Sequence, residues 1–328
     1  MLKKTIFMIS ALTLTLVGCQ TTDQNNTQSI NETSNDEETN EIVELPEVHL
    51  QKFDSGAQVK QLNQFLMSLG YDINDSSEFN QLTTWALTDI QLQLSPDNVT
   101  GMYDEQTKDI LNSLRDESLS ISVEDKLTKP EKPNALTNPV ENPYDVLALV
   151  NKEHALPNDY LPEDLVVPDV RFPFTEDVPK KQLRKVAATS LENLFKSSEE
   201  AGLELFAQSG YRSYERQEAI FNNNIERHGE EHANTYSARP GESEHQTGLV
   251  MDVTNQAVNF ELTTEFGKTK EGIWLKDNAH KYGFIIRYSK GKENITKYQY
   301  EPWHIRYVGN NLAKELHEKE ITLEEFYQ

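Results

Sequence analysis

Two short polar segments in the C-terminal half of the chain carry the residue types of a catalytic metal site. The first, residues 243–252, contains His245 and Asp252, and the second, residues 301–304, contains Glu301 and His304. Two imidazoles and one carboxylate form a ligand set that leaves the fourth tetrahedral position of a zinc ion open to water. The spare carboxylate could then accept the proton of that water. The two segments therefore predict a zinc hydrolase.

The first segment indicates which structural elements hold His245 and Asp252. Leu249 to Val253 is a short apolar run interrupted by Asp252, which predicts a buried strand with one functional group. His245 and Asp252 lie an odd number of residues apart, so one unbroken strand would point them to opposite faces. Because Gly248 can adopt a turn or a positive φ, we expect His245 in a loop that leads into the strand.

The second segment is expected in an irregular stretch between strands. Residues 298–300 and 305–308 predict strand on either side of Glu301 to His304. Pro302 cannot donate a ladder hydrogen bond, so it requires an edge, a bulge or a turn. Such an irregularity could present Glu301 to the water and His304 to the metal itself.

Five stretches follow one another along roughly residues 143–328: Ser209–Ser213, Ser237–Gly241, Ser243–Asp252, Trp274–Tyr288 and Glu301–Gly309. In these stretches the sequence resembles the VanY-type D-alanyl-D-alanine carboxypeptidases. The resemblance is specific because several motifs occur in the family's order. The chain has Val250-Met251 before the aspartate where the family usually has Ala-Val, a packing change behind the site.

The resemblance assigns roles to residues of both segments. It implies that His245, Asp252 and His304 hold one Zn²⁺ per catalytic domain and that Glu301 is the general base. It also places Arg212, Gln217 and Ser243 near the bound substrate, a peptidoglycan stem peptide. Arg212 is the best candidate to bind the free carboxylate of that peptide, because a guanidinium pairs with a carboxylate through two hydrogen bonds. The implied reaction is removal of the terminal D-alanine.

Plainer interpretations exist for several of these residues. An isolated histidine is usually structural or solvated, but His245 and His304 have carboxylates at fixed offsets. Arg212 could be a surface ion-pair partner. Ser243 could be a loop hydroxyl that bonds the backbone, and Gln217 is open to a similar reading.

A second metal motif competes with the first. His228-Gly229-Glu230-Glu231-His232 fits the H-x-x-E-H pattern of one class of zinc peptidases. That mechanism needs a firm helix with an apolar back, whereas Gly229 interrupts the helix and the flanking residues are polar. We therefore expect a solvated loop or frayed helix end here, not the catalytic site.

The N-terminus predicts export. Lys3 and Lys4 precede an apolar stretch from Ile6 to Val17, which is too short to span a membrane and has the form of a signal peptide, residues 1–18. Residues 16–19 resemble a bacterial lipobox. Cys19 is the only cysteine, so no disulfide within the chain is possible, and the resemblance implies a diacylglyceryl group on it. An ordinary cleaved signal with an incidental cysteine is the alternative.

Residues 19–47 are expected to form a disordered acidic tether. Positions 20–47 hold eight acidic residues and no basic ones, and they carry too little apolar area to offset chain entropy. The whole chain has a net charge of −23 and shows no basic stripe. We therefore expect no nucleic-acid partner. The same acidity disfavours electrostatic adhesion to anionic lipid, so membrane attachment depends on the lipid anchor alone. We expect an extracytoplasmic protein, lipid-anchored to the bacterial membrane and reaching the cell wall.

Residues 48–115 predict a small helical domain. Apolar residues recur at helical spacing in three runs, and Asn80 and Asp104 are plausible N-caps of the second and third. The pattern resembles the three-helix peptidoglycan-binding domain, through Gly56–Val59 with Leu62, Leu69–Tyr71, and Gly101–Asp104 with Thr107. A spacer bundle without a ligand would explain the same apolar stripe.

Prolines among charged residues mark residues 116–142 as a linker. The catalytic domain, residues 143–328, is predicted to be α+β, because helices come early and strands cluster around the metal motifs. Within it, residues 180–207 predict a long amphipathic helix followed by a strand.

Together these features predict a zinc-dependent D-alanyl-D-alanine carboxypeptidase on peptidoglycan stem peptides. An L,D-carboxypeptidase on tetrapeptide stems and an endopeptidase on cross-links remain alternatives. So do a non-catalytic wall-binding lipoprotein and an enzyme that uses iron(II), which accepts the same ligand set.

Overall fold

The computed structural model describes residues 44–123 and 138–328. The predicted signal peptide, Cys19, most of the tether and the middle of the linker lie outside these ranges. In the described ranges, no helix has both the length and the apolar character needed to cross a membrane.

The helical region contains three helices, α1 (Ala57–Ser68), α2 (Gln81–Leu94) and α3 (Glu105–Arg115). Asn80 caps α2 by accepting hydrogen bonds from the backbone of residues 82 and 83, and Asp104 caps α3 through the backbone N–H of Thr107. Both predicted N-caps are confirmed. The helices enclose a core of their own, which includes Val59, Leu62, Phe65, Leu66, Leu87, Ile90 and Leu111.

The predicted catalytic region, within residues 143–328, is built on a four-stranded sheet in the order β5-β6-β8-β7. All its neighbouring strands run antiparallel. The strands are β5 (Phe206–Ser209), β6 (Val250–Thr254), β7 (Phe284–Tyr288) and β8 (Glu301–Tyr307).

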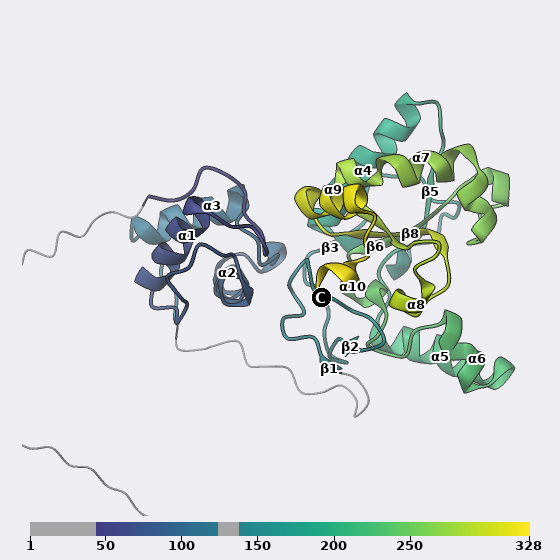
Figure 1. Ribbon diagram of the computed structural model, residues 1–328, viewed down its shortest axis with the longest axis horizontal. Helices are drawn as coiled ribbons and strands as arrows, with labels where there is room; N and C mark the ends of the chain where they lie inside the picture. The colour runs from purple at the N-terminus through teal and green to yellow at the C-terminus, as the bar shows by residue number, and fades with distance from the viewer. Residues whose placement is uncertain (1–43, 124–137) are drawn as a thin grey trace, which may run out of the picture. The chain divides into compact units, whose positions relative to one another are not determined.

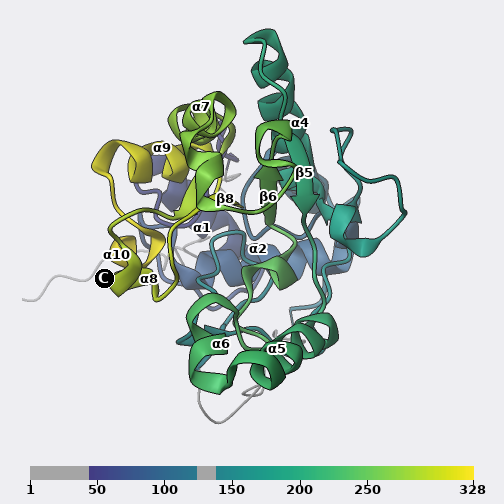
Figure 2. The ribbon, with the colours of Figure 1, turned by 90° about the vertical axis from the view of Figure 1, so that its right-hand side faces the viewer.

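One face of this sheet carries the core, and the other carries polar groups. Met251 and Val253 of β6, with Ile305 of β8, belong to the core cluster. Since side chains alternate along a strand, Asp252 and His304 project from the opposite face. In both views α4 (Lys185–Glu200), α7 (Lys270–Asn278) and α9 (Asn310–Lys319) lie on one side of the sheet, and α5 (Tyr214–His228) and α6 (Glu230–Tyr236) on the other (Figures 1 and 2).

Short elements connect these parts. They are η1 (Pro96–Asn98), β1 (Asn138–Pro139), β2 (His154–Ala155), β3 (Leu165–Val166), η2 (Pro179–Lys181), β4 (Leu183–Arg184), η3 (Glu244–Thr247), η4 (Gln256–Val258), η5 (Thr264–Lys268), η6 (Ala279–Tyr282), α8 (Glu293–Thr296) and α10 (Leu323–Phe326).

Two expected element boundaries are wrong. The helix predicted from residue 180 begins at Lys185, because residues 183–184 instead pair with β3. Residues 298–300 are not strand, and β8 runs unbroken from Glu301 through Pro302. Pro302, which has no N–H to donate, fits in β8 because the register between β7 and β8 shifts beside it. On the other side of β8, only residues 304–306 pair with β6. The predicted irregularity is therefore a bulge in an interior strand.

Candidate metal and active site

Three buried side chains converge at the polar face of the sheet. His245, Asp252 and His304 each offer one ligand atom, and these atoms lie within 4.8 Å of one another. His245 Nε2 is 3.4 Å from Asp252 Oδ2, and His304 Nδ1 is 3.1 Å from Asp252 Oδ1. The imidazole planes are nearly perpendicular, at 89°. Two nitrogens and one oxygen thus point at a common centre, which fits a divalent ion of the zinc type.

The sheet register brings two of these residues together. Asp252 of β6 and His304 of β8 are direct cross-strand partners, so their side chains leave the same face side by side. His245 lies outside the strand, as predicted, but in the short 3-10 helix η3 and not in an open loop. Gly248 ends η3 with φ +68°, and a Cβ there would lie 2.9 Å from Arg184 Cγ. Only glycine suits this turn into β6.

The outer ring nitrogens of the two histidines contact different groups. His245 Nδ1 is 2.7 Å from the carbonyl oxygen of Gly210. A carbonyl only accepts, so Nδ1 carries the proton and Nε2 keeps its lone pair for the centre. His304 is turned the other way, with Nε2 3.4 Å from Glu244 Oε2 and Nδ1 facing the centre.

The electrostatic surroundings of the two imidazoles also differ. Burial and the nearby Arg212 guanidinium lower the pKa of His245 to about 3. Burial alone would lower the pKa of His304 as well, but its hydrogen bonds to Asp252 and Glu244 raise that pKa to about 9. Burial opposes ionisation of Asp252, yet His245, His304 and Arg212 hold the pKa of its carboxyl below the usual value. The site therefore favours a carboxylate at Asp252.

Glu301 lies at the edge of the same group. Its Oε2 is 4.0 Å from His304 Nδ1, next to the centre but outside the ligand cluster. Burial raises the pKa of Glu301 to about 7. A carboxylate with that pKa exchanges protons readily near neutral pH, as a general base requires.

The predicted substrate residues line the same cavity, of about 220 Å³. Arg212 donates through Nη1 to Gln217 Oε1 at 2.9 Å and through Nη2 to Ser209 Oγ at 3.3 Å. Gln217 in turn donates to the carbonyl of Ala238 at 2.6 Å, which fixes its amide. Ser243 lines the cavity as well. All seven site residues predicted from the sequence thus lie around this one cavity.

Several residues of the site were not singled out by sequence reasoning. Glu244, Tyr236, Tyr288, Tyr298 and Trp303 also line the cavity. Among the described residues, the buried hydroxyls of Tyr236 and Tyr298 have no hydrogen-bond partner. A signal for Glu244 was present in the sequence: Arg287 stands within the apolar run 284–288 and Arg306 within the short run 305–308, and buried arginines require carboxylate partners.

The competing H-x-x-E-H segment does not form a comparable site. His228 ends α5 and His232 belongs to α6, with Gly229 between the two helices at φ +78°. The two rings lie 5.7 Å apart and both residues are exposed. Within the described ranges, His245, Asp252 and His304 are the only group of three or more such ligands that converges.

Comparison with known proteins identifies the family. Residues 180–310 match the family model VanY, D-alanyl-D-alanine carboxypeptidase, and residues 55–111 match a model described as "Putative peptidoglycan binding domain". Over 189 residues the chain is 53% identical to the Bacillus subtilis (strain 168) protein "Putative carboxypeptidase YodJ", covering 58% of this chain and 69% of that protein. The chain belongs to the VanY carboxypeptidase family.

Other VanY relatives agree with this. The bifunctional D-Ala-D-Ala dipeptidase and D-Ala-D-Ala carboxypeptidase VanXYC of Enterococcus gallinarum is 31% identical over 190 residues, which cover 55% of this chain and 93% of the relative. The solved structure of the LdcB LD-carboxypeptidase is similar with a TM-score of 0.59 and 51% identity, over 61% of this chain and 93% of that one. The expected architecture is confirmed: an α+β VanY-like catalytic domain preceded by a helical peptidoglycan-binding-like domain. The chain is a carboxypeptidase of peptidoglycan peptides.

Proposed function

We propose that this chain is a zinc-dependent carboxypeptidase that removes the terminal D-alanine from peptidoglycan stem peptides. The convergence of His245, Asp252 and His304 beside Glu301, in the cavity that also contains Arg212, is the observation that carries the proposal. The site joins a ligand set, a base and a cation for a free carboxylate. A carboxypeptidase needs all three.

The donor set supports zinc as the bound ion. His245 Nε2, His304 Nδ1 and one oxygen of Asp252 are the atoms that would hold it, and each imidazole has its other nitrogen engaged elsewhere. Three protein ligands leave a position open, which is the arrangement of catalytic zinc sites. When bound, zinc lowers the pKa of a ligated water and polarises the scissile carbonyl.

Glu301 is proposed to move the proton. Its carboxylate accepts a proton from the attacking water as the new C–O bond forms at the peptide carbonyl. It then returns that proton to the departing amine as the C–N bond breaks, so the products are free D-alanine and the shortened peptide. The raised pKa of Glu301, about 7, suits both transfers.

Arg212 is proposed to bind the free carboxylate of the terminal residue. Its hydrogen bonds to Gln217 and Ser209 hold the guanidinium at the cavity wall, and it is close enough to Asp252 and Glu301 to affect their pKa values. An ordered guanidinium recognises a carboxylate at little entropic cost. Gln217 thus acts by orienting Arg212, while Ser243 offers a hydroxyl to the peptide backbone.

The bond that is cut has two candidates. The VanY family description and VanXYC favour a D,D bond in a pentapeptide stem. The identity of 51% to the LdcB LD-carboxypeptidase favours an L,D bond in a tetrapeptide stem, and it exceeds the 31% identity to VanXYC.

The test uses the purified mature chain with pentapeptide and tetrapeptide muropeptides, each with and without a chelator, and mass spectrometry of the products. We expect the peptide to lose one alanine, the chelator to abolish this cleavage and added zinc to restore it. If only iron(II) restored cleavage, iron(II) would take the place of zinc in the proposal. Preference for one stem identifies the bond. Cleavage of cross-linked dimers without release of alanine would instead indicate an endopeptidase.

A second test addresses Arg212. Arg212→Ala should lower kcat/KM about 100-fold on a peptide with a free terminal carboxylate, because one charge-assisted contact is lost. The matched control is Arg216→Ala, an exposed arginine four residues along, which should leave kcat/KM unchanged. An equal loss for both variants, or the same loss on a C-terminally amidated peptide, would remove Arg212 from this role.

The division of the chain and its anchoring belong to the same proposal. Residues 1–18 would be removed as a signal, Cys19 would carry the lipid, and residues 19–47 and 116–142 would act as tether and linker. Residues 48–115 would bind the wall and residues 143–328 would catalyse. Fatty-acid labelling of the chain expressed in a bacterium, lost in Cys19→Ala, is the expected result, and labelling retained in that variant would contradict it.

A further inference from the structure

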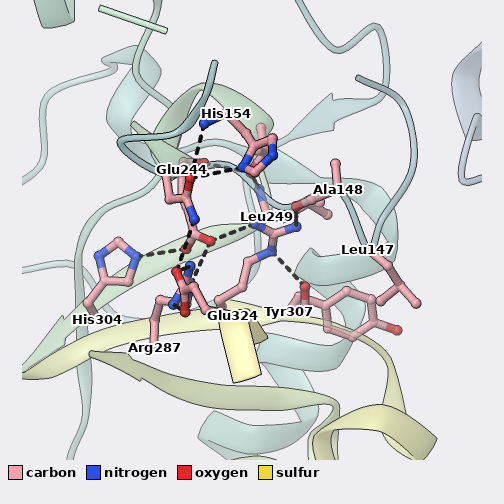
Figure 3. A network of polar contacts seen from close by, with 12 residues as sticks. Leu147, Ala148, His154, Glu244, Leu249, Arg287, His304, Tyr307 and Glu324 are labelled. Carbon is pink, nitrogen blue, oxygen red and sulfur yellow. Dashed lines mark hydrogen bonds and ion pairs between the residues drawn. The ribbon is translucent and has the colours of Figure 1, made fainter. Parts of the chain in front are cut away.

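A buried carboxylate outside the ligand set contacts one of the proposed ligands. Glu244 is 1% exposed and lies next to His245 in sequence, yet its side chain is directed toward His304. Its Oε2 is 3.4 Å from His304 Nε2, the ring nitrogen that faces away from the centre (Figure 3). The other oxygen, Oε1, accepts from Arg287 Nε at 2.8 Å and from Arg306 Nη1 at 2.9 Å.

The surrounding charges hold this carboxylate in place. Arg287 also pairs with Glu324 of α10 through both terminal nitrogens, at 2.6 and 2.8 Å (Figure 3). Arg306 donates in addition to the carbonyls of Val146 and Ala148. The negative charges of two carboxylates therefore balance the positive charges of two guanidiniums. Every side chain of this group of four is at most 10% exposed. Arg306 also donates to the carbonyl of Tyr307 at 3.0 Å. Besides Glu244, the two arginines thus have four polar partners that fix their positions, and the arginines in turn fix Glu244.

This arrangement has a consequence for the imidazole. With Oε1 bound to two cations, Glu244 offers His304 an oxygen that only accepts. Nε2 therefore keeps its proton toward Glu244. Nδ1, which lies 3.1 Å from the Asp252 carboxylate, is then the nitrogen that would give up its proton and offer its lone pair to a metal ion at the centre. A free imidazole samples both tautomers and can rotate its ring, and a ligand that must first reorganise binds metal less tightly.

We propose that Glu244 is a positioning residue that fixes the tautomer and ring orientation of His304 for metal binding. This inference rests on the proposed function of the same site. The two ligand histidines are then held by different means: His245 by a backbone carbonyl, and His304 by a charged side chain that substitution can change.

The test measures zinc affinity of the full chain by competition with a fluorescent chelator. In Glu244→Gln the amide oxygen stays with the two arginines, so the NH₂ group faces His304 and favours the opposite tautomer. We expect zinc binding weakened about 10- to 100-fold, the range typical of such outer partners. Glu244→Asp keeps the charge and should recover most of the affinity.

Glu324→Gln is the matched control, because it removes one carboxylate from the same buried group without touching His304. It should leave zinc affinity within about threefold of the parent, since no contact of the imidazole changes. Unaltered zinc affinity in Glu244→Gln would overturn the inference. So would equal losses in all three variants, which would show that only the stability of the cluster matters.

The two proposals fail in different ways. If the parent chain binds zinc and the Glu244 variants behave as expected but no stem peptide is cleaved, the proposed function is wrong and the positioning role stands. If the peptides are cleaved and Glu244→Gln binds zinc like the parent, the positioning role is wrong and the function stands.

Discussion

The helical region and the catalytic region both bury polar side chains, but of different kinds. In the helical region the central group is neutral: Gln91 donates to the hydroxyls of Thr100 and Thr107 and accepts from the backbone N–H groups of Thr100 and Gly101. In the catalytic region the group behind the site is ionic, with Glu244 between Arg287 and Arg306.

The difference shows what each region must do. A neutral amide satisfies a buried turn at a small desolvation cost, so it is sufficient where only shape is needed. Buried ion pairs cost several kcal/mol to desolvate and seldom add net stability. Despite burial, Arg287 and Arg306 keep the pKa of Glu244 well below its usual range, which favours the charged carboxylate. We infer that the buried charge of Glu244 is retained because it orients His304, the proposed metal ligand beside it. Three predictions follow for the two regions.

The largest effect is expected from Glu301→Gln. This change removes the proposed proton acceptor with little change in the size of the side chain, so kcat should fall about 10³-fold. Zinc affinity should stay near that of the parent, because Glu301 lies outside the ligand cluster. Turnover is measured by release of alanine and metal content by mass spectrometry. Normal turnover, or loss of metal together with activity, would remove Glu301 from the role of base.

The second prediction concerns the neutral group. Gln91→Leu leaves the backbone N–H groups of Thr100 and Gly101 without their acceptor, and it should lower the free energy of unfolding of the helical region by about 2–4 kcal/mol. Gln58→Leu, at an exposed position of α1, is the control and should cost less than about 1 kcal/mol. Both are measured by calorimetry of the full chain.

Carboxypeptidase activity below the unfolding temperature should be unchanged in both glutamine variants. A loss of activity in Gln91→Leu that parallels the loss of stability would break the comparison, because the neutral group would then also serve the catalytic site.

The smallest effect is expected at Glu242, a buried carboxyl near the site. Burial raises the pKa of Glu242 to about 7. The folded state then binds more protons than the unfolded state between about pH 4.5 and 7, so this residue makes stability fall as pH rises through that window. Glu242→Gln mimics the protonated form. It should therefore be more stable than the parent at pH 8, by about 1–3 kcal/mol, and similar to it at pH 4.5.

Thermal unfolding of both chains across pH 4–8 checks this prediction. A constant difference between the two chains at all pH values would mean that Glu242 does not titrate in this window.

Much of the fold could be predicted from residues that lie close together in the sequence. Asn80 and Asp104 were recognisable as N-caps, because capping depends on residues within three positions of the helix start. The start of α4 was missed because Leu183 and Arg184 pair with β3, a contact about twenty residues distant that no helical periodicity reveals. The extent of β8 was missed for the same reason, since Pro302 is tolerated only through a register shift with another strand.

The candidate site likewise has features that the sequence predicts and features that only the fold determines. The sequence by itself determined the types and order of His245, Asp252, Glu301 and His304, because each lies in a motif whose spacing and composition are local. Only the tertiary structure decided that Asp252 and His304 are cross-strand partners and that opposite ring nitrogens of the two histidines face the centre. It also decided that Glu244 contacts His304, 60 residues away, and not its neighbour His245. Such pairings arise from strand register and burial, in which residues far apart in the chain must satisfy one another's charge.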